Sequence, residues 1–210
     1  MWFKVPKAQK DWSAAEKHLA RVDPLMKRII ASVGPCTLSP RRDYFVKLCQ
    51  SIFTQQISTK VATVLFGRFR DQFPSRRPTP TAVLKFLKLD DQIIRSVGLS
   101  RQKRAYLEDL ATKWVDGHIP SGRFSSMEDD AIVESLTQVK GIGRWTVEMF
   151  LIFCLNRPDV FPVDDLGVRK SAQEAYGLTA LPTKQELLEL GEKWRPWRTI
   201  ATWYLWRRPN

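Results

Sequence analysis

The stretch from residue 136 to 146 reads Leu-Thr-Gln-Val-Lys-Gly-Ile-Gly-Arg-Trp-Thr and lies between two segments with helical periodicity. Gly141 and Gly143 stand one residue apart in it, which predicts a hairpin too tight for side chains, because glycine adopts positive φ at little cost. Such a turn exposes main-chain N–H groups at the start of the next helix, and these groups can bind phosphate. The stretch therefore indicates either a contact to a nucleic-acid backbone, independent of base sequence, or a plain linker between helices.

Outward from this stretch, apolar residues recur with a helical period along almost the whole chain, and no segment alternates convincingly with period two. We therefore predict an all-α fold. A first helical region, 14–33, is expected to be interrupted near Asp23-Pro24 and to end at Gly34-Pro35. The other helices are expected over about 44–73 (one long amphipathic stretch), 82–88, 90–97, 101–115, 129–139, 144–155, 165–176, 184–191 and 196–206.

The charge of the chain favours a polyanionic partner. Thirty-four Lys and Arg against 22 Asp and Glu give a formal net charge of +12 and a pI of about 9.9. Nucleic acid and anionic membrane are both compatible with this excess, and charge alone names neither. No apolar run has the length of a membrane-spanning helix, and residues 1–6 lack a signal-peptide core, so we expect a cytoplasmic or nucleoid-associated protein, nuclear in a eukaryote.

The cysteines and histidines exclude several site classes. Cys36, Cys49 and Cys154 are far apart in sequence, which argues against a zinc knuckle or a four-cysteine cluster, and we expect buried free thiols. His18 and His118 are the only histidines, too few for a zinc enzyme of the usual kind, and we expect no histidine-based triad.

Two motifs together resemble a known family. Gly-Ile-Gly-Arg-Trp-Thr is similar to the hairpin of the helix-hairpin-helix (HhH-GPD) DNA glycosylases, in particular the alkyladenine branch of 3-methyladenine DNA glycosylase II type. Residues 160–170, with Asp164-Asp165, stand where that family has a Gly/Pro-rich loop and a catalytic aspartate. Further similarity lies in 55–58, in 97–100 with Lys103, and in 195–206, so the resemblance covers about residues 23–206.

The resemblance implies two α-helical lobes with a DNA-binding cleft. One lobe would be continuous, over residues 50–154, and would contain the helix-hairpin-helix at about 134–150. The other would be built from both ends of the chain, 1–49 with 155–210. Fold resemblance alone does not decide function, so the residues of the site carry the rest.

Asp165 is the expected catalytic residue. The family's catalytic carboxylate has a hydrophobic residue three positions later; Val168 meets this condition for Asp165, whereas Gly167 does not for Asp164. We therefore interpret Asp164 as a helix N-cap. The reaction implied is hydrolytic excision of alkylated purines, of 3-methyladenine and 7-methylguanine type, with the aspartate stabilising an oxocarbenium-like transition state.

Other roles follow from the resemblance. Gln56 is the expected wedge that intercalates into DNA, with Gln55 and Ile57 beside it. No cofactor is required, although backbone carbonyls of the hairpin sometimes hold a monovalent cation in this family. The expected base pocket is Trp206, Trp145 and Met149, the last in place of a tyrosine; the DNA-backbone contacts are Gly141, Gly143, Arg144, Thr146 and Lys140; the cation carbonyls are Thr137, Val139 and Ile142.

The expected partner is double-stranded DNA containing damaged bases, bound by a monomer without a membrane. Bifunctional relatives carry a lysine nucleophile where this chain has Trp145, which predicts a monofunctional enzyme. Two alternatives stay open: a glycosylase for oxidised or deaminated bases on the same fold, and a non-catalytic DNA-binding helix-hairpin-helix protein. Asp165 and its loop argue against the second.

Overall fold

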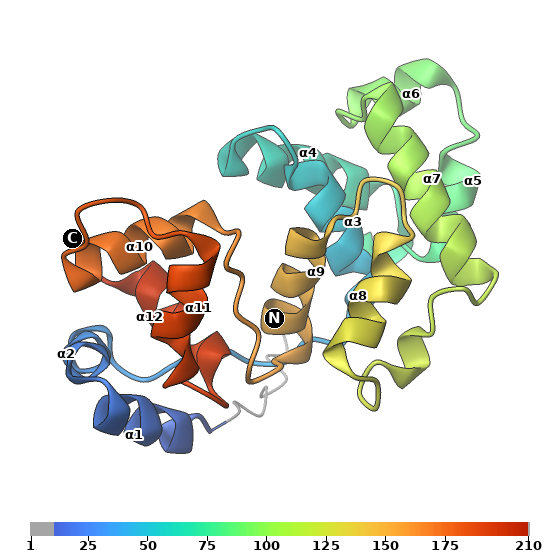
Figure 1. The fold of residues 1–210 in the computed structure, drawn as a ribbon. Coiled ribbons are helices and arrows are strands. Elements are labelled where there is room, and N and C mark those ends of the chain that lie inside the picture. Colours follow the sequence, from blue (N-terminus) through green and yellow to red (C-terminus); the bar gives the residue numbers. More distant parts are fainter. Residues whose placement is uncertain (1–10, 210) are drawn as a thin grey trace, which may run out of the picture. The chain divides into compact units, whose positions relative to one another are not determined.

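The computed structural model describes residues 11–209, and these form helices, turns and loops without a strand (Figure 1). The all-α prediction is therefore confirmed for this part of the chain. The helices belong to two compact units, one formed by Arg42–Phe150 and the other by residues up to Arg41 together with those from Leu151 onward. The sequence-based boundaries stood at 50 and 154. The first unit begins earlier because the helix that starts at Tyr44 packs against other helices of that unit.

The Arg42–Phe150 unit is arranged around a cluster of aromatic rings. Phe53 and Phe69 are fully buried and lie 5.0 Å apart between ring centroids. Helix α3 packs against α4, α7 and α9, and α5 packs along α7. The helices are α3 (Tyr44–Thr54), α4 (Thr59–Asp71), α5 (Pro80–Phe86), α6 (Asp91–Ser96), α7 (Arg101–Val115), α8 (Asp129–Thr137) and α9 (Arg144–Phe150), with short 3₁₀ turns at Pro74–Arg76 and Ser121–Arg123.

The other unit is built around its C-terminal helix. Every residue of this helix from 199 to 205 is buried, because α1, α2 and α10 all pack against it. The predicted interruption at Asp23-Pro24 is confirmed, since Asp23 caps the second helix. The elements are α1 (Ser13–Val22), α2 (Pro24–Val33), a π-helical turn (Leu151–Leu155), α10 (Leu166–Tyr176), α11 (Lys184–Glu192) and α12 (Arg198–Arg207).

The expectation of one long helix over 44–73 is wrong. The chain turns between α3 and α4, where Gln56 has a φ of 60°, a left-handed value that few residues other than glycine adopt. The hydroxyl of Ser58 accepts a hydrogen bond from the main-chain N–H of Val61 and so caps the start of α4. The motif 55–58 therefore lies at a turn between two helices rather than within one.

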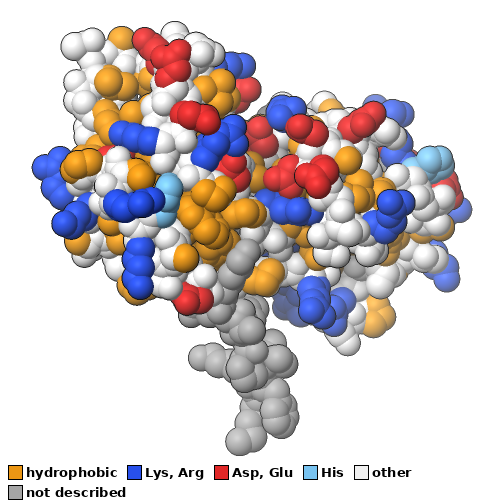
Figure 2. All heavy atoms as spheres, turned by 60° about the horizontal axis from the view of Figure 1, so that its bottom comes forward, with side chains coloured by type: hydrophobic (Ala, Val, Ile, Leu, Met, Phe, Trp, Pro, Cys, Tyr) orange, Lys and Arg blue, Asp and Glu red, His pale blue; other side chains and the backbone are white. Residues whose placement is uncertain are grey.

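The predicted state of the cysteines is confirmed, since Cys36, Cys49 and Cys154 are free and buried. Burial raises the pKa of the Cys36 thiol to about 11. Figure 2 shows that Lys and Arg side chains on one face of the molecule lie in separate groups with Asp and Glu between them. The excess charge thus identifies no single patch on this face. Within the described residues, no helix is long and apolar enough to span a bilayer.

Candidate active site and nucleic-acid interface

Asp165 caps the first turn of α10. Its Oδ1 accepts hydrogen bonds from the main-chain N–H of Val168, at 2.8 Å, and from the indole Nε1 of Trp206, at 3.0 Å. Val168 is fully buried, as the choice of Asp165 required. The N-cap role predicted for Asp164 is wrong, because the cap is Asp165 itself; Asp164 is exposed and forms an ion pair with Lys184.

The surroundings of this carboxylate are narrow and aromatic. A Cβ atom on Gly167 would lie 3.0 Å from Oδ1 of Asp165 and 3.4 Å from Nε1 of Trp206, so glycine keeps this contact unobstructed. The Trp206 ring stacks on Phe153, with 5.6 Å between centroids and 19° between planes. Phe153 was not predicted as a site residue. Its sequence signal was only that of an apolar helical position, although 38% of its surface is exposed.

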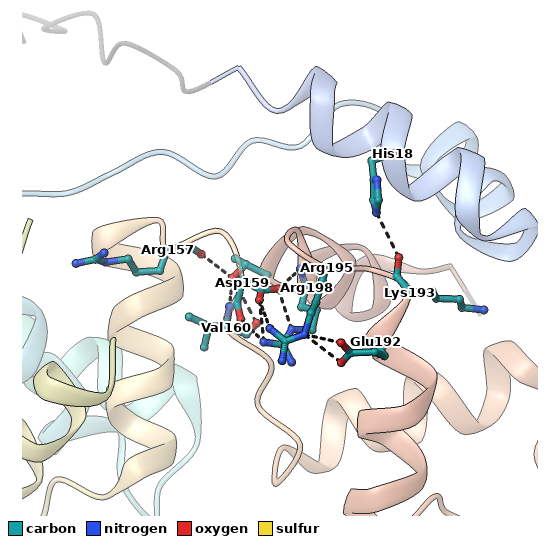
Figure 3. Close-up of polar contacts among 9 residues, drawn as sticks. His18, Arg157, Asp159, Val160, Glu192, Lys193, Arg195 and Arg198 are labelled. Atoms are coloured by element: carbon teal, nitrogen blue, oxygen red, sulfur yellow. Dashed lines mark hydrogen bonds and ion pairs between the residues drawn. The ribbon is translucent and has the colours of Figure 1, made fainter. Parts of the chain in front are cut away.

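A set of ion pairs holds the loop that leads to Asp165 (Figure 3). Arg198 donates from Nε and Nη2 to the two carboxylate oxygens of Asp159, each at 2.8 Å, and Arg195 donates to the same group at 2.7 Å. Arg195 also pairs with Glu192. This bidentate geometry fixes direction as well as distance. The similarity noted over 195–206 thus includes two arginines, Arg195 and Arg198, that bind Asp159 in the loop before Asp165. These two arginines are called the clamp on Asp159.

A buried hydroxyl strengthens the same clamp. Thr199, at the start of α12, donates a hydrogen bond to the carbonyl of Arg157 at 2.6 Å and accepts one from the N–H of Val160 at 2.9 Å. Its side chain is fully buried, so both main-chain groups are satisfied away from water. The loop is therefore anchored to α12, the helix that also carries Trp206.

In the other unit, the predicted hairpin connects α8 and α9. Gly141 has a φ of 80°, and a Cβ there would meet the Tyr106 ring at 2.2 Å, so both backbone conformation and space require glycine. Gly143 has no positive φ, and a Cβ there would meet nothing within 4 Å. The tight-turn argument is thus confirmed for Gly141, whereas Gly143 faces open space in front of the first turn of α9.

Three side chains from outside the hairpin contact it: those of Asp109, Gln55 and Tyr106. Asp109 on α7 accepts a hydrogen bond from the main-chain N–H of Lys140 at 2.9 Å and binds the Lys113 ammonium at 2.6 Å. Burial alone would raise the pKa of Asp109, but these two donors hold it below its ordinary value. Gln55 donates from Nε2 to the carbonyl of Gly141 at 2.6 Å, and the Tyr106 ring lies beneath that glycine. Asp109 and Lys113 are one helical turn apart, but the contacts of Asp109, Gln55 and Tyr106 with the hairpin join residues far apart in the sequence, which hid them from sequence analysis.

The residues predicted to contact a DNA backbone differ in exposure. Lys140 and Arg144 are exposed, and Arg144 pairs with Glu148 and Asp130 at the surface. Thr146, in contrast, is only 9% exposed. Its side chain is therefore unsuited to the predicted contact, and what the first turn of α9 offers at this position is the main-chain N–H.

The remaining predicted residues lie on α9 and at the α3–α4 turn. Trp145, 49% exposed, and Met149 stand one helical turn apart and so share a face of α9. Gln56 is exposed at the turn, between the half-buried Gln55 and Ile57. Asp165 and Trp206 are in direct contact within their unit.

The end of α3 next to this turn is held by a cation. Lys103 donates from Nζ to the carbonyl of Phe53 at 2.7 Å, and burial lowers the pKa of that ammonium. A cation at a helix C-terminus is favourable, because the last carbonyls lack partners within the helix.

The carbonyls proposed for a cation lie in the hairpin. Among them, Val139 O accepts the N–H of Ile142 at 3.0 Å, which uses one of its two lone pairs. The described residues contain no cluster of three or more His, Cys, Asp or Glu suited to a metal ion. The cation site at the hairpin carbonyls stays a prediction from the sequence.

The chain is similar in sequence to known proteins. The chain is 37% identical to DNA-3-methyladenine glycosylase 1 of Schizosaccharomyces pombe over 198 residues, 92% of this chain and 86% of that protein. It is 32% identical to the alkylbase DNA glycosidase-like protein mag2 of the same yeast, over 95% of each.

Solved structures are similar as well. The 3-methyladenine DNA glycosylase of the same yeast, in complex with abasic DNA, matches with a TM-score of 0.81 at 37% identity, over 92% of this chain and 95% of that one. A DNA-3-methyladenine glycosidase of Bacillus halodurans matches with a TM-score of 0.80 at 30% identity, over 94% and 90%. A family model described as HhH-GPD superfamily base excision DNA repair protein matches residues 49–196. The chain therefore belongs to the HhH-GPD superfamily of base excision DNA repair proteins.

Proposed function

We propose that the protein is a monofunctional DNA glycosylase that flips alkylated purines out of double-stranded DNA and excises them by hydrolysis. The observation that carries this proposal is the placement of Asp165, whose Oδ1 is bound by its own helix and by the Trp206 indole. The names of the relatives point to the same substrate class, alkylated bases such as 3-methyladenine.

The chemistry needs one positioned carboxylate. As the bond between C1′ and the base nitrogen breaks, positive charge develops on the sugar, and the Asp165 carboxylate stabilises it electrostatically. The bonding electrons leave with the base, and a purine alkylated at N3 or N7 is already cationic, so it departs neutral. Water then bonds to C1′ and loses a proton, for which Asp165 is the nearest proposed acceptor.

Aromatic surface beside the carboxylate suits a flipped cationic base. Trp206 stacked on Phe153 offers a π face, and a cation held over such a face gains about 0.5–2 kcal/mol. We assign Trp206 to the base pocket on this ground. The base-pocket roles of Trp145 and Met149, on α9, stay predictions from the sequence.

We propose that the hairpin and the α3–α4 turn make the contacts to DNA. The main-chain N–H groups after Gly143 would bind a phosphate, with Lys140 and Arg144 adding charge, and exposed Gln56 would fill the space left by the flipped base. We expect a monomer acting where genomic DNA lies. Affinity for undamaged duplex should fall steeply with rising salt, because bound counterions are released.

A monovalent cation is proposed at the hairpin carbonyls of Thr137, Val139 and Ile142. It would draw these oxygens together and thereby hold the hairpin's shape; it takes no part in bond breaking. Replacing potassium and sodium by tetramethylammonium at constant ionic strength should then weaken duplex binding.

The absence of a lysine nucleophile at position 145 underlies the monofunctional assignment. The Trp145 indole N–H donates but does not attack C1′, and the neighbouring Arg144 stays protonated. Borohydride treatment during turnover should trap no covalent adduct, and strands should break only after alkali. An adduct formed as fast as the base is released would overturn the assignment.

The deciding experiment is a panel of duplexes, each with one defined lesion, assayed for release of the free base. We expect 3-methyladenine and 7-methylguanine among the products. Release of only uracil or 8-oxoguanine would favour the oxidised- or deaminated-base alternative. Duplex binding without any release would favour the non-catalytic module.

A further inference from the structure

The α3–α4 turn and the hairpin are joined by a direct hydrogen bond. Gln55, the residue after α3, donates from its side-chain Nε2 to the carbonyl of Gly141 at 2.6 Å, across 86 positions of sequence. The side chain is part-buried, whereas the next residue, Gln56, is exposed with a φ of 60°. The two glutamines of the motif therefore have different surroundings.

The same turn and hairpin are also held through α7. Lys103, in the first turn of α7, binds the last turn of α3, and Tyr106 and Asp109, further along the helix, support Gly141 and Lys140. The three elements α3, α7 and the hairpin are thus each in contact with the other two within one unit. A displacement of the hairpin carbonyl would be transmitted to Gln55 and from there to the adjoining Gln56.

We infer that Gln55 is a positioning residue that couples phosphate binding by the hairpin to insertion of Gln56 into the DNA duplex. It does not act as a second wedge, since its amide nitrogen is engaged by the Gly141 carbonyl. Hairpin contact with the DNA backbone then sets the place at which Gln56 enters the base stack. This inference rests on the proposed function, because insertion has meaning only for a protein that extrudes a base.

The test is a double-mutant cycle with Gln55→Leu and Gln56→Ala, measured on a 7-methylguanine duplex that carries 2-aminopurine next to the lesion. Leucine keeps approximate size and removes the donor. Gln55→Leu should lower the single-turnover rate of base release and the 2-aminopurine signal of unstacking by about tenfold or more. Affinity for undamaged duplex should change less than about threefold. If Gln55 acts through Gln56, the double variant should be no slower than Gln56→Ala alone.

The matched control is Gln185→Leu. Gln185 is an exposed glutamine on α11 whose amide donates to its helical neighbour Glu189, and the variant should retain wild-type rates. Melting temperatures of all variants identify losses caused by unfolding. Additive losses in the double variant, a loss of duplex affinity as large as the loss of rate, or an unchanged rate in Gln55→Leu would each overturn the coupling. A wild-type protein that releases no base from any duplex would instead overturn the proposed function.

Discussion

Asp23 and Asp165 are built on the same local plan. Each is the residue before a helix, and each accepts hydrogen bonds from the first turn of that helix: Asp23 from the main-chain N–H groups of Leu25 and Met26 in α2, and Asp165 from that of Val168 in α10. Each also accepts an indole N–H at 3.0 Å, from Trp194 in the first case and Trp206 in the second. An N-cap that also accepts an indole N–H is therefore common to a buried aspartate and to the catalytic candidate.

The difference lies in what surrounds the carboxylate. Asp23 is 1% exposed and also binds the Tyr176 hydroxyl at 2.5 Å and the Lys193 ammonium at 3.1 Å. Burial acts to raise its pKa, but the donors outweigh it and hold the pKa below the ordinary value. Asp165 is half-buried beside a stacked aromatic pair. The comparison indicates that access, rather than the cap, separates a carboxylate that stabilises the fold from one that can meet a substrate.

The largest expected effect is on chemistry, at Asp165. Asp165→Asn should lower the single-turnover rate of base release by roughly three orders of magnitude, because the amide carries no charge to stabilise the developing sugar cation. Asparagine is itself a good N-cap, so the melting temperature should stay near that of the wild type. Binding to abasic duplex should persist. A variant that keeps its rate would remove Asp165 from the catalytic role and with it the contrast to Asp23.

The second effect is on stability, at Asp23. Asp23→Asn puts an amide nitrogen or an uncharged oxygen where Tyr176, Trp194 and Lys193 donate, and should cost about 3 kcal/mol of unfolding free energy. The melting temperature would fall by roughly 6–12 °C for a protein of this size. Base release per folded molecule, measured well below the melting temperature, should change little. A large loss of rate without a loss of stability would break the comparison.

The pH dependence of this effect has a defined sign. The pKa of Asp23 is lowered in the folded protein from the ordinary value of 3.8, so its contribution to stability is fully present above that value. The contribution is lost as pH falls through the folded pKa. The stability gap between wild type and Asp23→Asn should therefore be constant from neutral pH to about pH 5 and should narrow below about pH 4. A gap that widened in acid would contradict this sign.

Sequence alone could predict elements whose cause is local. Gly141 predicts the hairpin, and Pro24 after Asp23 predicts the break between the first two helices. The sequence analysis placed the N-cap of α10 one residue too early, at Asp164. Both Asp164 and Asp165 favour a helix start, and only the packing of Val168 selects between them. The clamp on Asp159 and the support of Gly141 by Gln55 were out of reach, since both join residues far apart in the chain.

The third prediction compares the two indole donors. Trp206→Phe keeps a ring against Phe153 but removes the hydrogen bond to Asp165, and should lower the rate of base release by about tenfold, the value of roughly one charge-assisted hydrogen bond. Trp194→Phe should instead lower stability by about 1–3 kcal/mol, because Trp194 is fully buried and its indole serves Asp23. The loss in Trp206→Phe should therefore appear mainly in the rate of base release, and the loss in Trp194→Phe mainly in the melting temperature. Equal effects on stability would mean that Trp206 only supports the fold.

The smallest effect is expected at Asp164, the neighbour that the site does not use. Its carboxylate is about half exposed and pairs with Lys184, whose side chain is 62% exposed. Surface pairs of this kind contribute little, because water and salt screen them and two long side chains lose freedom on pairing. Asp164→Asn should therefore change the unfolding free energy by less than about 0.5 kcal/mol and the rate of base release by less than about twofold. Both are measured beside Asp165→Asn under the same conditions, since the two variants remove the same charge one residue apart. If Asp164→Asn were the inactive variant, the burial of Val168 and the contact with Trp206 would not identify the catalytic carboxylate. The greater exposure of the Asp165 carboxylate would then no longer explain how its role differs from that of Asp23.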